Sequence, residues 1–191
     1  MDKLQEAAET FKRLLGYKYR FVIGRKGIKK EFWLDFDRAD FHHLCGLHKL
    51  KDIAQLQQGM RSRVFDEILA GNITEELIEK SEFFSDMSMR IEPLSHLEEM
   101  LDNNELIFRY NEKVQKFSVI RADYLLEEEI LRTRTFLFLG GREGSDIQMC
   151  RTFFPLQRVD YTEGQPKYTL LRKEKFNTVT GETETQYNRL S

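Results

Sequence analysis

The chain has 191 residues, 40% of them hydrophobic, and 30 basic residues stand against 32 acidic ones. This length and apolar content suit one large domain whose core needs neither disulfides nor metals to fold. The net charge of −2 argues against a general nucleic-acid coat protein, which carries a basic excess, although a local basic groove is compatible with it. The 3 prolines and 11 glycines argue against a disordered or fibrous chain.

Features that would direct the chain to a membrane or an oxidising compartment are not found. The segment from Met1 to Leu15 mixes charged with apolar residues, unlike the apolar region of a signal peptide. No run of eighteen apolar residues occurs, so no spanning helix is expected. Cys45 and Cys150 lie in apolar stretches and are interpreted as reduced core residues. The sequence therefore predicts a cytoplasmic protein without a membrane segment.

The first predicted elements are a helix and a hairpin. Apolar residues recur at helical spacing after Asp2, which can cap the helix, and Gly16 ends it. The period then changes to two over 17–23 and over 28–36, on either side of the turn from Gly24 to Gly27. Alternation on both sides of a glycine-containing turn predicts a β-hairpin.

The segment 41–50 is predicted to continue the helical part of the chain from a polar start at 37–40. On a helix its leucines and Phe41 share one apolar arc. His42 and Lys49 then lie opposite that arc, whereas His43 and His48 lie at its margins, toward the sheet or a crevice beside it. Further helices are expected over about 61–70 and 72–80, and a short helix has Pro93 in its first turn and includes Leu94, Leu97 and Leu101.

The rest of the chain is predicted to form strands. Alternating or apolar stretches occur over 106–110, 117–122, 135–139, 147–154 and 168–173, and short polar or glycine-bearing connections between them favour an antiparallel meander. The run of glutamates at 127–129 is interpreted as a solvated stretch, the glycines of 139–144 as a turn, and the tail from 177 as a loose hairpin or a frayed end. The predicted fold class is α+β in a single domain over 1–191, with an N-terminal helix and hairpin, a helical middle and an antiparallel sheet in the C-terminal half.

The densest cluster of reactive side chains is histidine. Three of the four histidines lie between positions 42 and 48. Histidine has an unperturbed pKa of roughly 6.5 and exchanges protons near neutral pH, so His43 and His48 are candidates for proton transfer. A metal site is the alternative, but these two are five residues apart and no third ligand is obvious nearby. For either residue alone, a structural role is about as common as a functional one.

Basic and hydroxyl side chains supply the second group of candidates. Lys49 and Lys51 follow the histidines, and Ser118, Arg121, Arg151 and Thr152 occur among apolar residues of predicted strands. Each of these alone is more often solvent-facing than functional. Adjacent residues of a strand point to opposite faces, so at most one of Arg151 and Thr152 is expected at a given site. Trp33, Tyr110 and Tyr161 can stack on a base, although a core role is the more common one for each.

Other catalytic and cofactor motifs do not occur in the sequence. HExxH and paired cysteines, which would indicate a metal site, are missing, as are the GxGxxG, GxxxxGK[ST] and GxSxG patterns. No cofactor or metal is therefore predicted.

Two stretches carry a resemblance to a known family. Glu31 to Phe36 and then Phe41 to Ile53, which includes Phe-His-His-Leu-x-Gly-Leu-x-x-Leu, resemble the phage-Barnase-EndoU-colicin-RelE-like nucleases, in particular their fourth subgroup. Ser81, the strand Cys150 to Phe154 and the strand Tyr168 to Lys173 are similar as well. The resemblance covers roughly 16–175, and the histidine segment is its most specific part.

The resemblance implies an α+β fold, with a helix against a curved sheet, and metal-independent cleavage of RNA through the ribose 2′-hydroxyl. That chemistry needs a base, an acid and a group that neutralises phosphate charge. On this reading His43, His48, Arg151 and Thr152 are the catalytic candidates. The candidates for substrate contact are Lys49, Lys51, Ser118, Arg121 and Tyr110.

Three functions follow from these observations. The first is an RNA endonuclease, as a prophage-linked toxin or defence effector that a protein antitoxin or immunity partner would neutralise. The second is a non-catalytic module that binds RNA or protein and retains the fold. The third is a metal-assisted hydrolase, which the histidine spacing disfavours. Loss of cleavage in a His43→Ala variant, or in EDTA, would discriminate among them.

Overall fold

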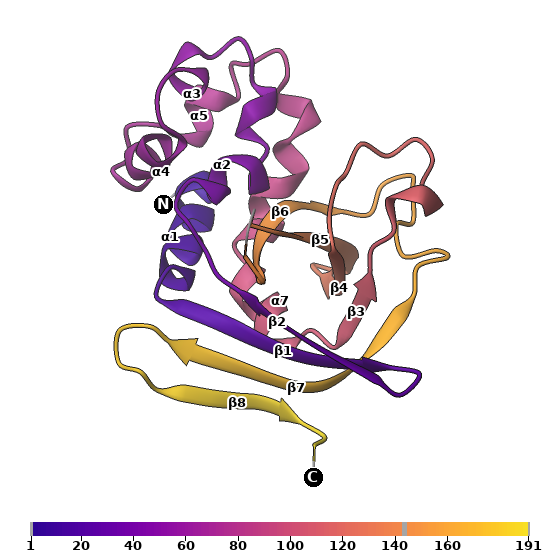
Figure 1. Ribbon diagram of the computed structural model, residues 1–191. Coiled ribbons are helices and arrows are strands. Elements are labelled where there is room, and N and C mark those ends of the chain that lie inside the picture. The colour runs from indigo at the N-terminus through magenta and orange to yellow at the C-terminus, as the bar shows by residue number, and fades with distance from the viewer. Residues whose placement is uncertain (1, 143–144, 191) are drawn as a thin grey trace.

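The computed structural model describes residues 2–142 and 145–190, and it combines a helical layer with one β-sheet (Figure 1). The strands are β1 (Tyr17–Arg25), β2 (Ile28–Leu34), β3 (Leu106–Arg109), β4 (Tyr124–Ile130), β5 (Thr133–Gly141), β6 (Ile147–Pro155), β7 (Lys167–Asn177) and β8 (Thr183–Asn188). They follow the order β1-β2-β6-β5-β4-β3-β7-β8, and an additional pairing of β1 with β7 closes seven strands into a barrel-like ring.

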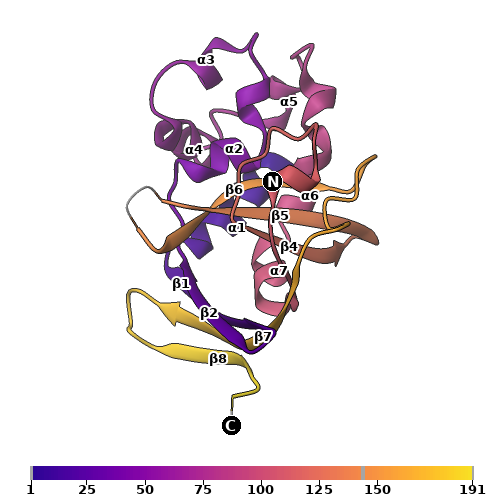
Figure 2. The same cartoon turned by 45° about the vertical axis from the view of Figure 1, so that its right-hand side comes forward.

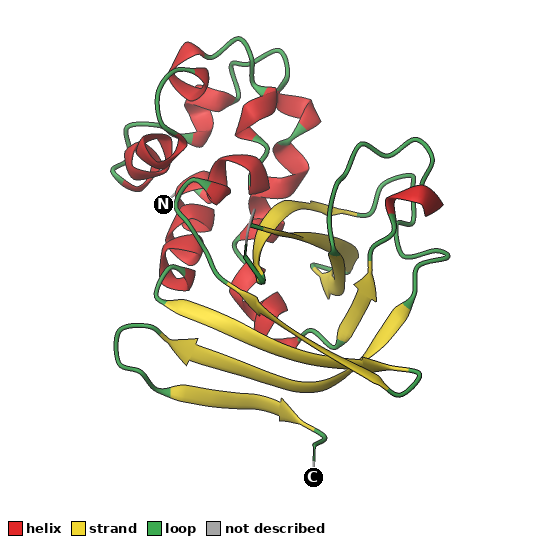
Figure 3. Cartoon of the chain, viewed as in Figure 1, coloured by secondary structure: helices red, strands yellow, loops and turns green. Residues whose placement is uncertain are grey.

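The helices cover one side of this ring (Figure 3). They are α1 (Lys3–Leu14), α2 (Asp40–Leu44), α3 (Ala54–Gln57), α4 (Arg61–Leu69), α5 (Glu75–Ile78), α6 (Ile91–Leu94) and α7 (Leu97–Asn103). Four 3-10 turns complete them: η1 (Leu47–Lys49), η2 (Phe84–Asp86), η3 (Ser88–Arg90) and η4 (Glu112–Val114). None of the helices in the described parts of the chain has the length and apolar character that a bilayer crossing requires.

Two separate clusters of buried side chains hold these layers together. The larger lies where the helices meet the sheet, with Phe11 of α1 packed 5.7 Å from Phe41 and 5.8 Å from Phe65 between ring centroids. The smaller is aromatic and belongs to the ring of strands: Phe136 and Phe138 of β5 pack there with Phe154 and other rings. Residues of the loops after β3 and after β6 pack against the smaller cluster, among them Ile120 and Tyr161.

The α+β class and most predicted elements are confirmed. Helix α1 begins after Asp2, whose carboxylate accepts a hydrogen bond from the Gln5 amide, and the hairpin β1–β2 pairs antiparallel. Cys45 and Cys150 are buried and form no disulfide. The tail pairs with β7 as strand β8. Unlike the predicted meander, the sheet is mixed, because β2 and β6 run parallel, and it includes the N-terminal hairpin.

Several boundaries differ from the predictions, each for a local reason. The stretch 117–122 is a loop, and the following glutamates lie within β4, where Glu127 is buried and paired with Arg134. The helix predicted from 72 begins later, because Thr74 accepts a hydrogen bond from the Leu77 amide and caps it. The short helix at Pro93 is divided into α6 and α7.

The predicted glycine turn is wrong where it can be compared with the structure. Gly140 and Gly141 end β5 and pair with β6, so they belong to the sheet. The rest of that turn falls partly on Glu143 and Gly144, which lie outside the described residues.

Candidate functional site

The histidine segment is not one continuous helix. Helix α2 ends at Leu44, Gly46 adopts a left-handed conformation with φ of 83°, and η1 follows. The break turns His43 and His48 toward each other, with ring centroids 4.5 Å apart. His42, predicted to lie opposite the apolar arc, is instead buried, and its Nε2 lies 2.8 Å from the Leu56 carbonyl oxygen.

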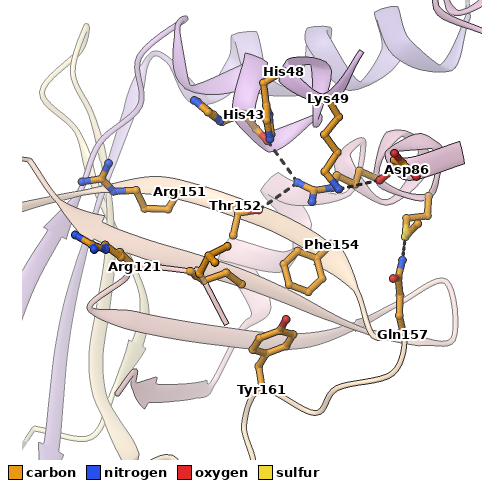
Figure 4. A pocket seen from close by; sticks show the side chains of 14 residues that line it. His43, His48, Lys49, Asp86, Arg121, Arg151, Thr152, Phe154, Gln157 and Tyr161 are labelled. Atoms are coloured by element: carbon orange, nitrogen blue, oxygen red, sulfur yellow. Dashed lines mark hydrogen bonds between the residues drawn. The ribbon is translucent and has the colours of Figure 1, made fainter. Parts of the chain in front are cut away.

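A pocket of about 510 Å³ lies beside these two histidines, between the helical layer and β6 (Figure 4). Its lining comes from α2, η1, η2 and η3 on one side, and from the loop after β3, strand β6 and the loop after β6 on the other. The lining residues are His43, His48, Lys49, Asp86, Met89, Arg90, Val119, Ile120, Arg121, Arg151, Thr152, Phe154, Gln157 and Tyr161.

A β-bulge explains why both Arg151 and Thr152 line this pocket. In the pairing of β5 with β6, Phe138 faces Thr152 and Leu139 faces Cys150, so Arg151 is an extra residue without a partner. The expectation that at most one of the two would point to the site is therefore wrong, since a bulge re-aims a side chain. Gly140 leaves space for the arginine: a Cβ there would lie 2.5 Å from the Arg151 Nε.

Arg90 was not among the residues singled out from the sequence, yet it is the most buried cation of the pocket, with 7% of its surface exposed. Its Nη1 donates a 3.1 Å hydrogen bond to the Thr152 hydroxyl, and its guanidinium lies 5.4 Å from the centre of the Phe154 ring. The Arg90 side chain packs closely against Gly46, where a side chain would crowd it, because a Cβ at Gly46 would lie 3.2 Å from the Arg90 Cδ. An arginine flanked by Met89 and Ile91 in the sequence was the available, weak signal.

Four cations of the pocket have no carboxylate partner within the described residues: Lys49, Arg90, Arg121 and Arg151. Lys49 donates to the backbone carbonyl of Asp86 at 2.9 Å, and Arg151 donates to that of Gly141 at 2.8 Å. Asp86 is the acidic residue of the pocket lining. Burial, and then the charge of Arg90, lowers the pKa of Lys49, and the opposing effect of the Asp86 charge is smaller. Arg90 is the buried one of the four, and because a buried cation without a counter-charge is costly, an anionic ligand would offset that cost.

The pKa values of both histidines are lowered, which favours their neutral forms. Burial, and then the positive charge of Arg61, lowers the pKa of His43 below its ordinary value. Burial, and then the charge of His43, lowers the pKa of His48 to about 4. The Nδ1 of His48 is buried without a hydrogen-bond partner in the part of the chain that the structure describes, which leaves Nε2 as the nitrogen available to a ligand.

The remaining candidates lie apart from the pocket lining. Lys51 is exposed beyond η1, and Tyr110 is buried in the smaller core. Ser118 faces Tyr110, with 3.3 Å between the two hydroxyl oxygens, and so supports the loop behind the pocket. Of the aromatic residues considered for stacking, Tyr161 lines the pocket, whereas Trp33 lies in β2 next to Ile147 of β6.

Within residues 2–142 and 145–190, no group of three histidine, cysteine, aspartate or glutamate side chains is placed to hold a metal ion. Compared with protein families, residues 3–190 match the family model for phage-Barnase-EndoU-ColicinE5/D-RelE like nuclease 4. The chain belongs to this family. The match covers every element of the fold, and therefore both sides of the pocket. Neither a search of curated proteins nor a search of solved structures returned a match.

Proposed function

We propose that the chain is a metal-independent RNA endonuclease that cleaves by transesterification through the ribose 2′-hydroxyl. The observation that carries the proposal is the position of the paired imidazoles, 4.5 Å apart, beside four cations without carboxylate partners among the described residues. Membership in a nuclease family supports phosphodiester chemistry at this site. The choice of RNA rests on the paired imidazoles, because a base and an acid are the groups that attack by a neighbouring 2′-hydroxyl requires.

The scissile phosphate binds, in this proposal, beside Arg90. The Arg90 guanidinium is held by the Thr152 hydroxyl and the Phe154 ring, so it needs little reorganisation to bind an anion. Arg151 and Lys49 approach from the two sides of the pocket and contribute further positive charge. A planar guanidinium with several donors suits the oxygens of a phosphate, whose charge grows as the 2′-oxygen attacks.

The two histidines divide the proton transfers between them. Neighbouring imidazoles disfavour double protonation, so the pair holds one proton at intermediate pH and presents one base and one acid. The pKa of His48 is lowered further than that of His43, so the proton rests on His43. His48 takes the proton of the 2′-hydroxyl, the 2′-oxygen bonds to phosphorus, and the bond from phosphorus to the 5′-oxygen breaks. His43 gives its proton to the departing 5′-oxygen, and a 2′,3′-cyclic phosphate remains.

The decisive experiment incubates purified protein with end-labelled RNA in EDTA. Cleavage with cyclic-phosphate ends is expected, and His43→Ala should reduce its rate by roughly 10²- to 10⁴-fold, the usual contribution of a general acid or base. His96→Ala is the matched control, since the fourth histidine is outside the pocket. RNA binding by the parent with no cleavage of any RNA would favour the binding module instead, and equal rates in parent and variant would remove His43 from the mechanism.

We also propose that the enzyme acts in the cytoplasm as a phage-linked toxin or defence effector, neutralised by a partner protein. The phage association in the description of the family supports this role. Expression of the parent in bacterial cells should arrest growth, and expression of the His43→Ala variant at the same level should not. Unimpaired growth with an active parent enzyme would contradict the toxin role.

A further inference from the structure

The loop between β3 and β4, residues 110–123, carries large apolar side chains that contact solvent. Phe117 is fully exposed, and Val119, two residues later, is 93% exposed. The same loop supplies Val119, Ile120 and Arg121 to the pocket lining. Single exposed apolar residues are common, but a fully exposed aromatic ring next to a cationic pocket calls for a ligand.

Hydrogen bonds hold this loop against the loop after β6. The Asn111 amide donates to the Gln165 side chain at 2.7 Å, and Gln165 Nε2 donates back to the Asn111 carbonyl at 3.1 Å. Nearer the tip, Gln115 Nε2 donates to the Asp160 carbonyl at 3.3 Å. Figure 2 shows the two loops at the end of the ring of strands. These hydrogen bonds hold the loop that carries Phe117, so its exposed ring belongs to an anchored loop.

We propose that this loop is a recognition arm for single-stranded RNA, in which Phe117 stacks on an unpaired base whose neighbouring phosphate occupies the pocket. The inference rests on the proposed function and adds the substrate class. Lys113 and Lys116 precede Phe117 in the chain, and Arg121 of the same loop lines the pocket, so the loop carries positive charge as well as the exposed ring. Aromatic stacking combined with a cationic track is how proteins bind unpaired bases, which a duplex keeps inside its own stack.

The test measures affinity in the His43→Ala background, where RNA stays intact. Fluorescence anisotropy with a labelled ten-nucleotide uridine strand compares Phe117→Ala and Phe117→Trp with that parent. Phe117→Ala should weaken binding about tenfold, and Phe117→Trp should restore it, because stacking needs an aromatic face. Val179→Ala is the control, since that apolar residue is also highly exposed, at 86%, but lies in the turn before β8. Affinity for a blunt RNA duplex should be the same with and without Phe117.

Salt dependence separates stacking from charge. The slope of log affinity against log salt should be unchanged by Phe117→Ala, whereas Lys116→Ala should reduce it by about 0.7 if this lysine neutralises one phosphate. An unchanged affinity of Phe117→Ala for single strands, in a parent that binds RNA, would overturn the recognition arm alone and leave the loop as a surface for a protein. A parent that neither binds nor cleaves any RNA would overturn the proposed function together with it.

Discussion

Two of the cation clusters in the molecule, the one around Lys175 of β7 and the one in the pocket, differ in what neutralises their charge. Lys175 Nζ lies 3.0 Å from Asp102 and 3.1 Å from Glu98, and the Tyr19 hydroxyl donates to Asp102 at 2.6 Å. In the pocket, Arg90 meets a threonine hydroxyl and an aromatic face, and no carboxylate within the described residues. The first cluster has its counter-ions built in and is structural, whereas the second leaves positive charge available to a ligand.

The largest effect should come from removing the buried pocket cation. Arg90→Met keeps the length and apolar stem of the side chain but cannot contact phosphate. Cleavage should fall about 10²- to 10³-fold, as for the loss of one preorganised donor to a developing oxyanion. The free energy of unfolding should be unchanged or higher, because an uncompensated buried charge has been replaced by an apolar group. Single-turnover cleavage and urea unfolding measure the two quantities.

Arg38→Met is the matched control for that change, since Arg38 is exposed and paired with Asp66 outside the pocket. It should leave cleavage within about twofold of the parent, as expected for a surface ion pair of small energetic weight. Full activity in Arg90→Met would remove the distinction between the two clusters, because the pocket cation would then be no more functional than Lys175 of β7.

Burial of the two imidazoles sets the pH dependence. Both histidine pKa values are lowered, that of His48 to about 4, so above pH 6.5 neither imidazole is protonated and the pair lacks its acid. Below about pH 4 both imidazoles are protonated, so the pair lacks its base. The profile of kcat/KM, which reports the free enzyme, should therefore be bell-shaped with its maximum between about pH 4 and 6.5, and should fall about tenfold per unit on the alkaline side. A maximum above pH 7 would contradict this assignment of the pair.

A change in the cluster around Lys175 should lower stability and leave activity unchanged. Asp102→Asn removes a negative charge that neutralises the largely buried Lys175, and it weakens the acceptor of the Tyr19 hydroxyl. Removing one partner of a buried pair is strongly destabilising, but Glu98 still faces the lysine and Asp102 is partly exposed. We therefore expect a loss of about 2 kcal/mol in the free energy of unfolding. Activity per folded molecule should stay within twofold, and a larger loss of activity would show that the clusters are coupled.

Part of the fold and part of the pocket could be predicted from the sequence. The period-two hairpin and the capped first helix were predictable, because both depend on neighbours along the chain. His43 and His48 were named as candidates from their clustering, and the structure places both in the pocket. The sequence did not reveal that Gly46 breaks the helix between them, since a single glycine does not state its φ angle.

Long-range packing accounts for what was missed. Arg90 belongs to a stretch of short turns without clear periodicity, and only the approach of β6 makes it a pocket residue. The stretch 117–122 alternates as a strand does, yet it is a loop in which Phe117 and Val119 face solvent while Ile120 and Ala122 pack against the smaller core. The run of glutamates lies in β4 because Arg134 from the neighbouring strand binds Glu127 with distances of 2.7 and 2.8 Å.

The smallest effect tests the bulge that brings Arg151 into the pocket. In Gly140→Ala the new Cβ would meet the Arg151 side chain at 2.5 Å and would displace it from the pocket wall. The obstacle is a flexible side chain and Gly140 does not need a left-handed backbone, so stability should change by less than about 1 kcal/mol. RNA affinity should weaken a few-fold, with a shallower salt dependence, because one phosphate contact is lost. Arg151→Ala should give the same shift, and adding Gly140→Ala to it should have no further effect. Additive losses would show that Gly140 acts on binding by a route other than Arg151.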